Sequence, residues 1–231
     1  MATKKKLLQA AAGSAGGAGA DVSEVFSTTL YKTNNTSITV TTGLDGTGSE
    51  KVLYWTKPRV DAAQDDYSLV DNVRQTSSFA RLASNRSDAE TTSENGLYQF
   101  TSTGYLAGQA AHFNGNLQGS NSGGGVDQVT WGFKKTPKFF DIVTFSTTTG
   151  SSTPITVNHN LGSVPGMIIV KTTNITGDWF VFHRSLGSTK YLDLGSSDQA
   201  QTGGTSKWAS APTSTSFTLG GDFVQNATYV A

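Results

Sequence analysis

Residues 155–171 read ITVNHNLGSVPGMIIVK, and this segment contains the pattern of strand, turn and strand that recurs along the chain. Two apolar, β-branched runs, 155–157 and 167–170, flank a segment of Asn, Gly and Pro, which favour turns. Gly162 and Gly166 can adopt positive φ, and Pro165 fixes φ and lacks an N–H group. The segment therefore predicts a strand, a tight corner and a second, buried strand, with Leu161 and Val164 as apolar contacts of the corner.

Short runs of the same kind recur along the chain and predict an all-β fold. Charged residues make up only 15% of the sequence, and Thr, Ser, Gly and Asn are abundant, which suits short strands with hydroxyl-rich faces and many turns. The expected strands are 28–31, 37–41, 52–55, 67–70, 79–82, 97–100, 104–106, 129–133, 142–145, 155–157, 167–170, 178–182, 190–194 and 216–220.

The strand pattern repeats. Three strands align with strands that lie 112 positions later in the chain. In these alignments Val70 matches Phe182, Leu82 matches Leu194, and Tyr105 matches Phe217. The run 38–40 has the same residues as 155–157, and the run 52–55 aligns with 167–170. A constant shift of this size predicts duplicated domains rather than a solenoid. We expect two tandem β-sandwich domains, 21–134 and 141–231, joined by a linker at 135–140. The last strand is short, so we expect the natural chain to continue past Ala231.

Residues 1–20 form a separate N-terminal arm. A short helix is expected over about 4–12, ended by Gly13 and followed by a Gly/Ala linker. A secretory signal is the alternative, but its apolar core would be too short and is broken by Gln9. An arm of this kind typically becomes ordered on a partner. The expected docking residues are Lys4, Lys5, Lys6, Leu7 and Leu8.

Charge and composition exclude several classes of partner. The chain has 17 basic and 17 acidic side chains, which argues against nucleic acid or an anionic membrane surface as partner. It has no cysteine, so disulfides and thiolate metal sites are excluded. No apolar run approaches the roughly 20 residues of a membrane span.

The polar residues show no catalytic or metal-binding spacing. His159 and His183 could form a metal site with Asp178 or Asp193, but no spaced ligand set is present, and His159 is expected to bond the corner backbone. A Ser-His-Asp triad lacks a nucleophile-elbow motif. Asp65 and Asp66 are adjacent, so they would point to opposite faces of a strand and not to one glycosidic bond. No cofactor is expected.

Aromatic side chains offer a different possibility, a sugar-stacking platform. Most of them fall within strand runs, where core packing is the default. Trp208 lies outside those runs and is expected to be an exposed contact. His112, Asn114 and Asn116 lie in a loop region and are the other candidates for contact with a glycan or a partner surface. The corner residues His159, Leu161, Gly162, Pro165 and Gly166 are interpreted as architecture.

Three stretches resemble structural proteins of tailed bacteriophages, especially phages of marine bacteria and cyanobacteria. They are MATKKKLLQAAAGSAGG at the start, VTWGFKKTPKFFDIVTF in the middle, and NHNLGSVPGMIIVKTTNITGDWFVFHRSLGSTKYLDL near the end. The resemblance implies a virion protein of the tail or tail-fibre type, with a β-sandwich fold and no enzymatic activity. It implies synthesis in the host cytoplasm and assembly with other tail proteins, as a homo-oligomer that is trimeric by analogy with tail fibres. The alternatives are a glycan-binding, lectin-like module for host recognition and a capsule depolymerase.

Overall fold

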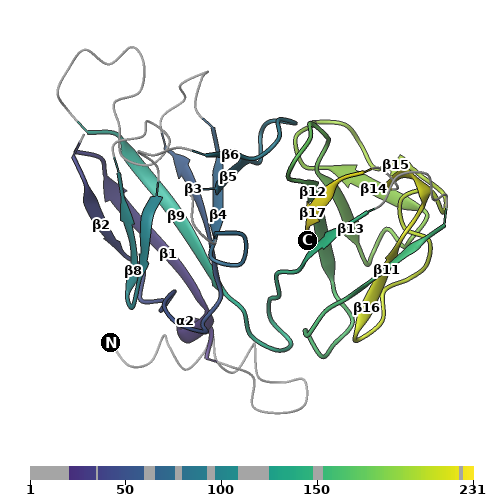
Figure 1. Cartoon of the computed structure of the whole chain (residues 1–231), viewed down its shortest axis with the longest axis horizontal. Helices are drawn as coiled ribbons and strands as arrows, with labels where there is room; N and C mark the ends of the chain where they lie inside the picture. The colour runs from purple at the N-terminus through teal and green to yellow at the C-terminus, as the bar shows by residue number, and fades with distance from the viewer. Residues whose placement is uncertain are drawn as a thin grey trace.

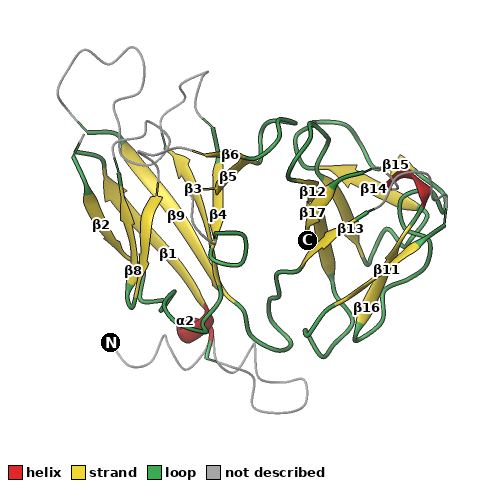
Figure 2. Cartoon of the chain, viewed as in Figure 1, coloured by secondary structure: helices red, strands yellow, loops and turns green. Residues whose placement is uncertain are grey.

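The computed structural model describes residues 21–34, 36–59, 66–75, 80–92, 97–108, 125–147, 153–223 and 226–231. These residues confirm the all-β prediction, because antiparallel strands dominate and helix is confined to two short turns, as Figure 2 shows. One turn is α2 (Val22–Val25), whose N-cap is Asp21; its carboxylate accepts a hydrogen bond from the Ser23 N–H at 2.9 Å. The other is the 3-10 turn η1 (Gly221–Phe223). No helix among the described residues is long and apolar enough to cross a membrane.

The first half of the chain forms the N-terminal lobe, which has two sheets. The larger sheet has the order β1 (Phe26–Lys32), β9 (Asp127–Lys134), β3 (Val52–Pro58), β4 (Ser68–Asp71), β5 (Ala80–Ala83) and β6 (Thr91–Thr92). The smaller sheet has the order β2 (Ile38–Thr41), β8 (Gly104–Ala107) and β7 (Leu97–Thr101). Tyr54 and Tyr105 lie at the centre of the core between these sheets, with ring centroids 4.7 Å apart.

The second half forms the C-terminal lobe on a similar plan. Its larger sheet has the order β10 (Thr144–Ser146), β17 (Thr228–Val230), β12 (Met167–Thr172), β13 (Phe180–His183), β14 (Lys190–Asp193) and β15 (Gln201–Thr202). Its smaller sheet pairs β11 (Ile155–Asn158) with β16 (Ser216–Leu219). Phe182, Phe217 and Trp208 are among the buried residues of its core.

The larger sheets of the two lobes have the same strand order. In each lobe the first strand of the chain, β1 or β10, lies at one edge and pairs with the last strand, β9 or β17. The last strand pairs in turn with the third strand of the lobe, β3 or β12, and the next three strands follow in chain order. The small sheets agree in register as well, because Val40 pairs with Tyr105 and Val157 pairs with Phe217.

The strand pairing corrects the sequence alignment at two strands. Tyr54 pairs with Val70, and Ile168 pairs with Phe182, so Tyr54 corresponds to Ile168 and not to Ile169 as the predicted alignment had it. Similarly, Leu69 pairs with Leu82, and Val181 pairs with Leu192. Leu82 therefore corresponds to Leu192 rather than Leu194, and the shift of 112 does not hold at this strand.

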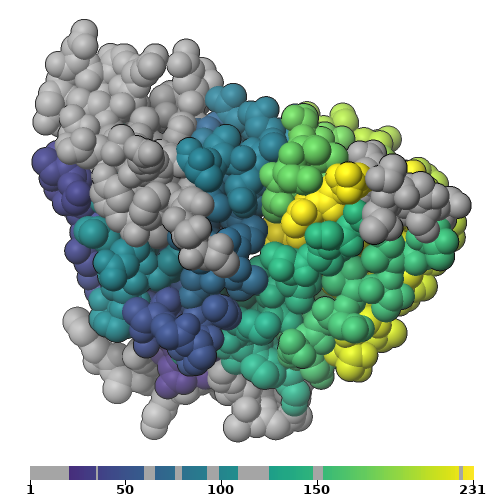
Figure 3. Space-filling view, in the orientation of Figure 1, coloured from purple at the N-terminus to yellow at the C-terminus, as the bar shows by residue number. Residues whose placement is uncertain are grey.

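The four sheets stack in layers, with the two larger sheets facing each other in the middle and the smaller sheets on the outside (Figure 1). Leu69, Leu82 and Trp179 form a third buried apolar cluster, which lies between the lobes. Each larger sheet is thus covered on both faces at this point, which explains why every residue of β4 is buried. Figure 3 shows the two lobes meeting along a seam.

Candidate functional site

A cleft with a volume of about 680 Å³ lies between the two larger sheets. Its walls are mainly apolar: Trp55 and Phe133 come from the N-terminal lobe, and Ile169 and Met167 from β12. A volume of several hundred Å³ with apolar walls is typical of a site that binds a ligand or a segment of a partner. We call this hollow the interlobe cleft.

One end of the interlobe cleft is closed by a strap, residues 85–90, which reaches from the N-terminal lobe to the other. The Glu90 N–H donates to the Thr173 carbonyl at 2.7 Å, and the Gly177 N–H donates to the Ser87 carbonyl at 2.8 Å. The Trp179 indole N–H lies within hydrogen-bond distance of the Ala83 and Arg86 carbonyls, at 3.0 and 2.9 Å. These bonds fix the strap across the seam.

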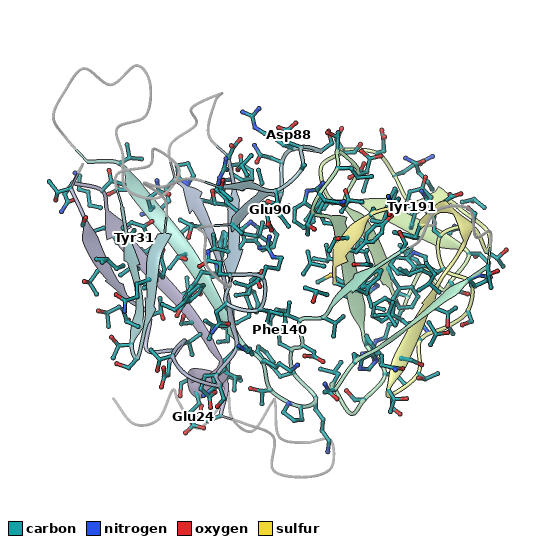
Figure 4. All side chains as sticks on the ribbon, viewed as in Figure 1. Glu24, Tyr31, Asp88, Glu90, Phe140 and Tyr191 are labelled. Atoms are coloured by element: carbon teal, nitrogen blue, oxygen red, sulfur yellow. The ribbon has the colours of Figure 1, made fainter. Side chains whose placement is uncertain are left out.

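The other end is closed by the linker, residues 135–140, which contacts the corner, residues 158–166. The Lys138 N–H donates to the Leu161 carbonyl at 2.6 Å. Asp141 accepts from the Asn160 N–H at 2.6 Å and forms an ion pair with Lys135 at 2.6 Å. Figure 4 shows Glu90 and Phe140 at these two crossings.

Apolar side chains are unusually exposed along the mouth of the cleft. Phe139 is 40% exposed, Val164 is 52% exposed and Met167 is 57% exposed. These three residues line the interlobe cleft, and the described chain has only two other large apolar residues so exposed, Val22 and Leu30. Apolar side chains gathered around a cleft are a common feature of interaction surfaces. The sequence predicted that Val164 would pack within the corner. Its exposure of 52% shows that this prediction was wrong.

The corner residues contribute directly to this cleft. His159 is buried and lines the cleft; its Nδ1 accepts from the Leu161 N–H at 3.2 Å, and its ring stacks on Phe217. Its Nε2 is buried and has no hydrogen-bond partner among the described residues. Gly162 has a φ of 67°, which favours glycine, and Pro165 is buried. His159 therefore holds the shape of the corner by its backbone bond.

The charged side chains deep in the cleft are paired. Asp71 is fully buried and accepts from the Arg74 Nε at 2.5 Å and from the Val73 and Arg74 N–H groups. Arg74 also forms an ion pair with Glu90 of the strap. Paired charges of this kind fix the strap and leave the apolar walls to contact a ligand.

A second hollow of about 370 Å³ lies beyond Trp179, which lines both hollows. Its other walls are polar and include Asn85, Asp88, Asp178 and Asp193. We call it the polar hollow. No group of three or more His, Cys, Asp or Glu side chains in the described part of the chain is arranged to hold a metal ion. Carboxylate and amide oxygens in this setting can accept hydrogen bonds from hydroxyl groups.

A buried lysine of β12, Lys171, contacts the strap across the seam. The Lys171 ammonium group donates to the Ser87 carbonyl at 3.1 Å and to the Thr172 hydroxyl at 3.3 Å. Burial lowers the pKa of Lys171 to about 8, and the nearby carboxylates of Asp178 and Asp88 oppose this effect. A cationic side chain thus contributes to the contact between the lobes.

The structure corrects the sequence-based expectation for Trp208. Its side chain is 1% exposed, packs on Phe182 and Phe223, and pairs as a β-bridge with Leu219. It lies outside a named strand but occupies the strand position beside β16, so it belongs to the core and is not an exposed contact. The other predicted contact residues, His112, Asn114 and Asn116, lie outside the described residues, as do Lys4, Lys5, Lys6, Leu7 and Leu8.

Sequence reasoning missed the interlobe cleft, although one signal for it was present. The runs VLYW and MIIV place apolar residues at consecutive positions, so both faces of each strand are apolar. That pattern predicts that both faces of the sheet are packed against other parts of the structure, but it does not identify those parts.

Comparison with known proteins identifies a family whose function is not known. Residues 21–231 match the model of a family described as a domain of unknown function (DUF7483). Neither the curated proteins nor the solved structures gave a match.

Proposed function

The chain belongs to the DUF7483 family, and we propose that it is a non-enzymatic structural component of a tailed-phage virion, of the tail or tail-fibre type. The phage assignment rests on the resemblance of three sequence stretches to such proteins. The all-β architecture is compatible with this role, since antiparallel sheets are common in structural subunits. In this proposal the protein is made in the host cytoplasm and becomes part of the tail.

The observation that carries the proposal is the interlobe cleft with its exposed apolar rim. Phe139, Val164 and Met167 leave apolar surface in water, which is costly unless a partner covers it. A subunit of a larger assembly has such a partner. We propose that the covering group is a polypeptide segment, supplied by the chain itself or by a neighbouring subunit, and that the chain is a binding unit within a homo-oligomer, trimeric by analogy with tail fibres.

We also propose that the two lobes are tandem β-sandwich domains related by internal duplication. The matching strand order of the larger sheets and the matching register of the small sheets support this relationship. Two copies of one unit would give a subunit with two large sheets that can face each other, which is the arrangement that creates the cleft.

The test is incorporation into particles. Deletion of residues 1–20 is expected to abolish incorporation, because the arm is the proposed docking element, and Met167→Glu is expected to reduce it strongly. Leu30→Glu is the matched control, since Leu30 is also exposed, at 61%, but lies on the edge strand β1 and does not line the cleft. Normal incorporation of the deletion variant would refute docking through the arm, and equal effects of the two Glu variants would refute a specific role for the cleft.

A glycan-binding role is the second candidate, and the polar hollow is the observation that favours it. Asn85, Asp88, Asp178 and Asp193 present oxygen acceptors in a hollow large enough for a sugar ring. We expect a glycan array to show binding that Asp178→Ala abolishes and that Asp198→Ala, an exposed carboxylate outside the hollow, leaves unchanged. No binding at millimolar sugar would eliminate this candidate.

A further inference from the structure

We propose that the interlobe cleft binds residues 4–12 of the chain's own N-terminal arm, KKKLLQAAA. This inference rests on the proposed function, because it identifies the polypeptide that covers the apolar rim. It gives the arm a binding site on its own chain in addition to its proposed docking on other virion proteins.

The first argument is the place where the arm joins the body. The described chain begins with Asp21 and α2, which lies beside β9. Phe26 follows α2 and packs on Phe133 of β9 with ring centroids 5.2 Å apart, and Phe133 packs on Phe140 at 5.3 Å. Phe133 and Phe140 both line the cleft. A short row of aromatic rings thus connects the base of the arm with the linker end of the cleft.

The second argument is reach. Leu7 lies 14 residues before Asp21, which allows a span of up to about 46 Å for an extended chain. The residues between them are mainly Gly and Ala. A short tether of this composition gives an effective concentration on the order of 1 mM at a site beside its anchor. The chain's own arm is therefore favoured over the arm of another copy at ordinary protein concentrations.

The third argument is chemical match and direction. The arm has five apolar side chains that can pack on the exposed side chains of Val164 and Met167, namely those of Leu7, Leu8 and the three alanines at 10–12. Because the arm is anchored at the linker end, its N-terminal end runs towards Trp179 and the polar hollow. Lys4, Lys5 and Lys6 then approach Trp179, beyond which Asp88 and Asp178 line the polar hollow. This order pairs the leucines with apolar walls and the lysines with carboxylates.

The experiment measures binding of a labelled peptide of residues 1–20 by fluorescence anisotropy. The receptor is the full chain with Leu7→Glu and Leu8→Glu, whose own arm no longer competes. If the peptide binds this receptor with a Kd of about 100 μM, the wild-type chain should bind it about tenfold more weakly, because its own arm competes at about 1 mM. Met167→Glu in the Leu7→Glu/Leu8→Glu chain should abolish binding, and Leu30→Glu in the same chain should leave it unchanged.

Three results would overturn the inference. One is the absence of saturable binding to the Leu7→Glu/Leu8→Glu chain. Another is equal affinity for that chain and the wild type, which would mean that the chain's own arm does not occupy the site and would leave the arm of a second copy as occupant. The third is unchanged binding after Met167→Glu, which would place the peptide elsewhere. Particle incorporation is a separate measurement, so a peptide that fails to bind would leave the proposed virion role standing.

Discussion

Replacement of Lys171 by Met tests whether a buried cation lies at the seam between the lobes. Lys171 is 1% exposed, and its ammonium group donates to the Ser87 carbonyl of the strap. Burial lowers its pKa to about 8 from 10.5, although Asp178 and Asp88 favour the charged form. The Ser87 carbonyl also accepts from the Gly177 N–H, so it keeps a partner in Lys171→Met. We therefore expect the variant to fold and to be at least as stable as the wild type at pH 7.5.

The sign of the pH effect follows from the lowered pKa. Between about pH 8 and 10.5 the unfolded chain keeps the Lys171 proton more readily than the folded chain does. The free energy of unfolding therefore rises with pH in this range, by about 2 kcal/mol between pH 7.5 and 9.5. Burial raises the pKa of Tyr54 to about 12 and also raises that of Tyr105, so these tyrosines lower stability as the pH rises above about 10. The measurement should therefore stop at pH 9.5.

The assay is urea unfolding of the wild type and Lys171→Met at pH 7.5 and 9.5. The wild type should gain about 2 kcal/mol more than the variant over this interval. Lys190→Met is the control, because Lys190 is exposed on β14 of the same lobe, and it should keep the wild-type pH dependence. Identical pH dependence in wild type and Lys171→Met would show that the ammonium group is not desolvated in the folded chain.

Three further substitutions test other contacts. Asp141→Asn should cost about 2 kcal/mol in urea unfolding, because it weakens charge-assisted bonds to Lys135 and the Asn160 N–H; a loss below about 0.5 kcal/mol would contradict a structural role. Trp208→Ala should cost about 3–5 kcal/mol and lower the melting temperature, since the side chain is in the core; full stability would restore the surface interpretation. Gly162→Ala should cost about 1 kcal/mol because φ is 67°, whereas no loss would mean that the corner has another shape.

The positions of the strands were largely predictable, because alternation and turn residues are local signals. The runs 38–40 and 155–157 were assigned as equivalent strands from identical residues, and they occupy equivalent places beside Tyr105 and Phe217. Strand register was less predictable. The runs 52–55 and 167–170 are apolar at every position, so they carry no alternation that would fix which residues face the core, and their alignment slipped by one residue.

Neither the burial of Trp208 nor the candidate site could be predicted from the sequence, because both depend on contacts between segments that are distant in sequence. Burial of Trp208 depends on its bridge to Leu219, a contact that the surrounding Ser and Ala residues do not signal. The cleft depends on how two sheets face each other, which no single segment encodes. Lys171 is buried and donates to the Ser87 carbonyl of the strap, a contact between segments 84 positions apart that no local pattern encodes.

The corner shows why equivalent segments of the two lobes differ in what they do. In the N-terminal lobe the corresponding residue Leu44 is buried in its own core, where its carbonyl accepts from the Tyr54 hydroxyl at 3.2 Å. In the C-terminal lobe the Leu161 carbonyl accepts instead from the linker, and Val164 is left exposed at the cleft. The corner at 158–166 is therefore both architecture and part of the candidate site. Its bond to the linker holds the lobes together, and its exposed apolar side chain, Val164, lines the interlobe cleft.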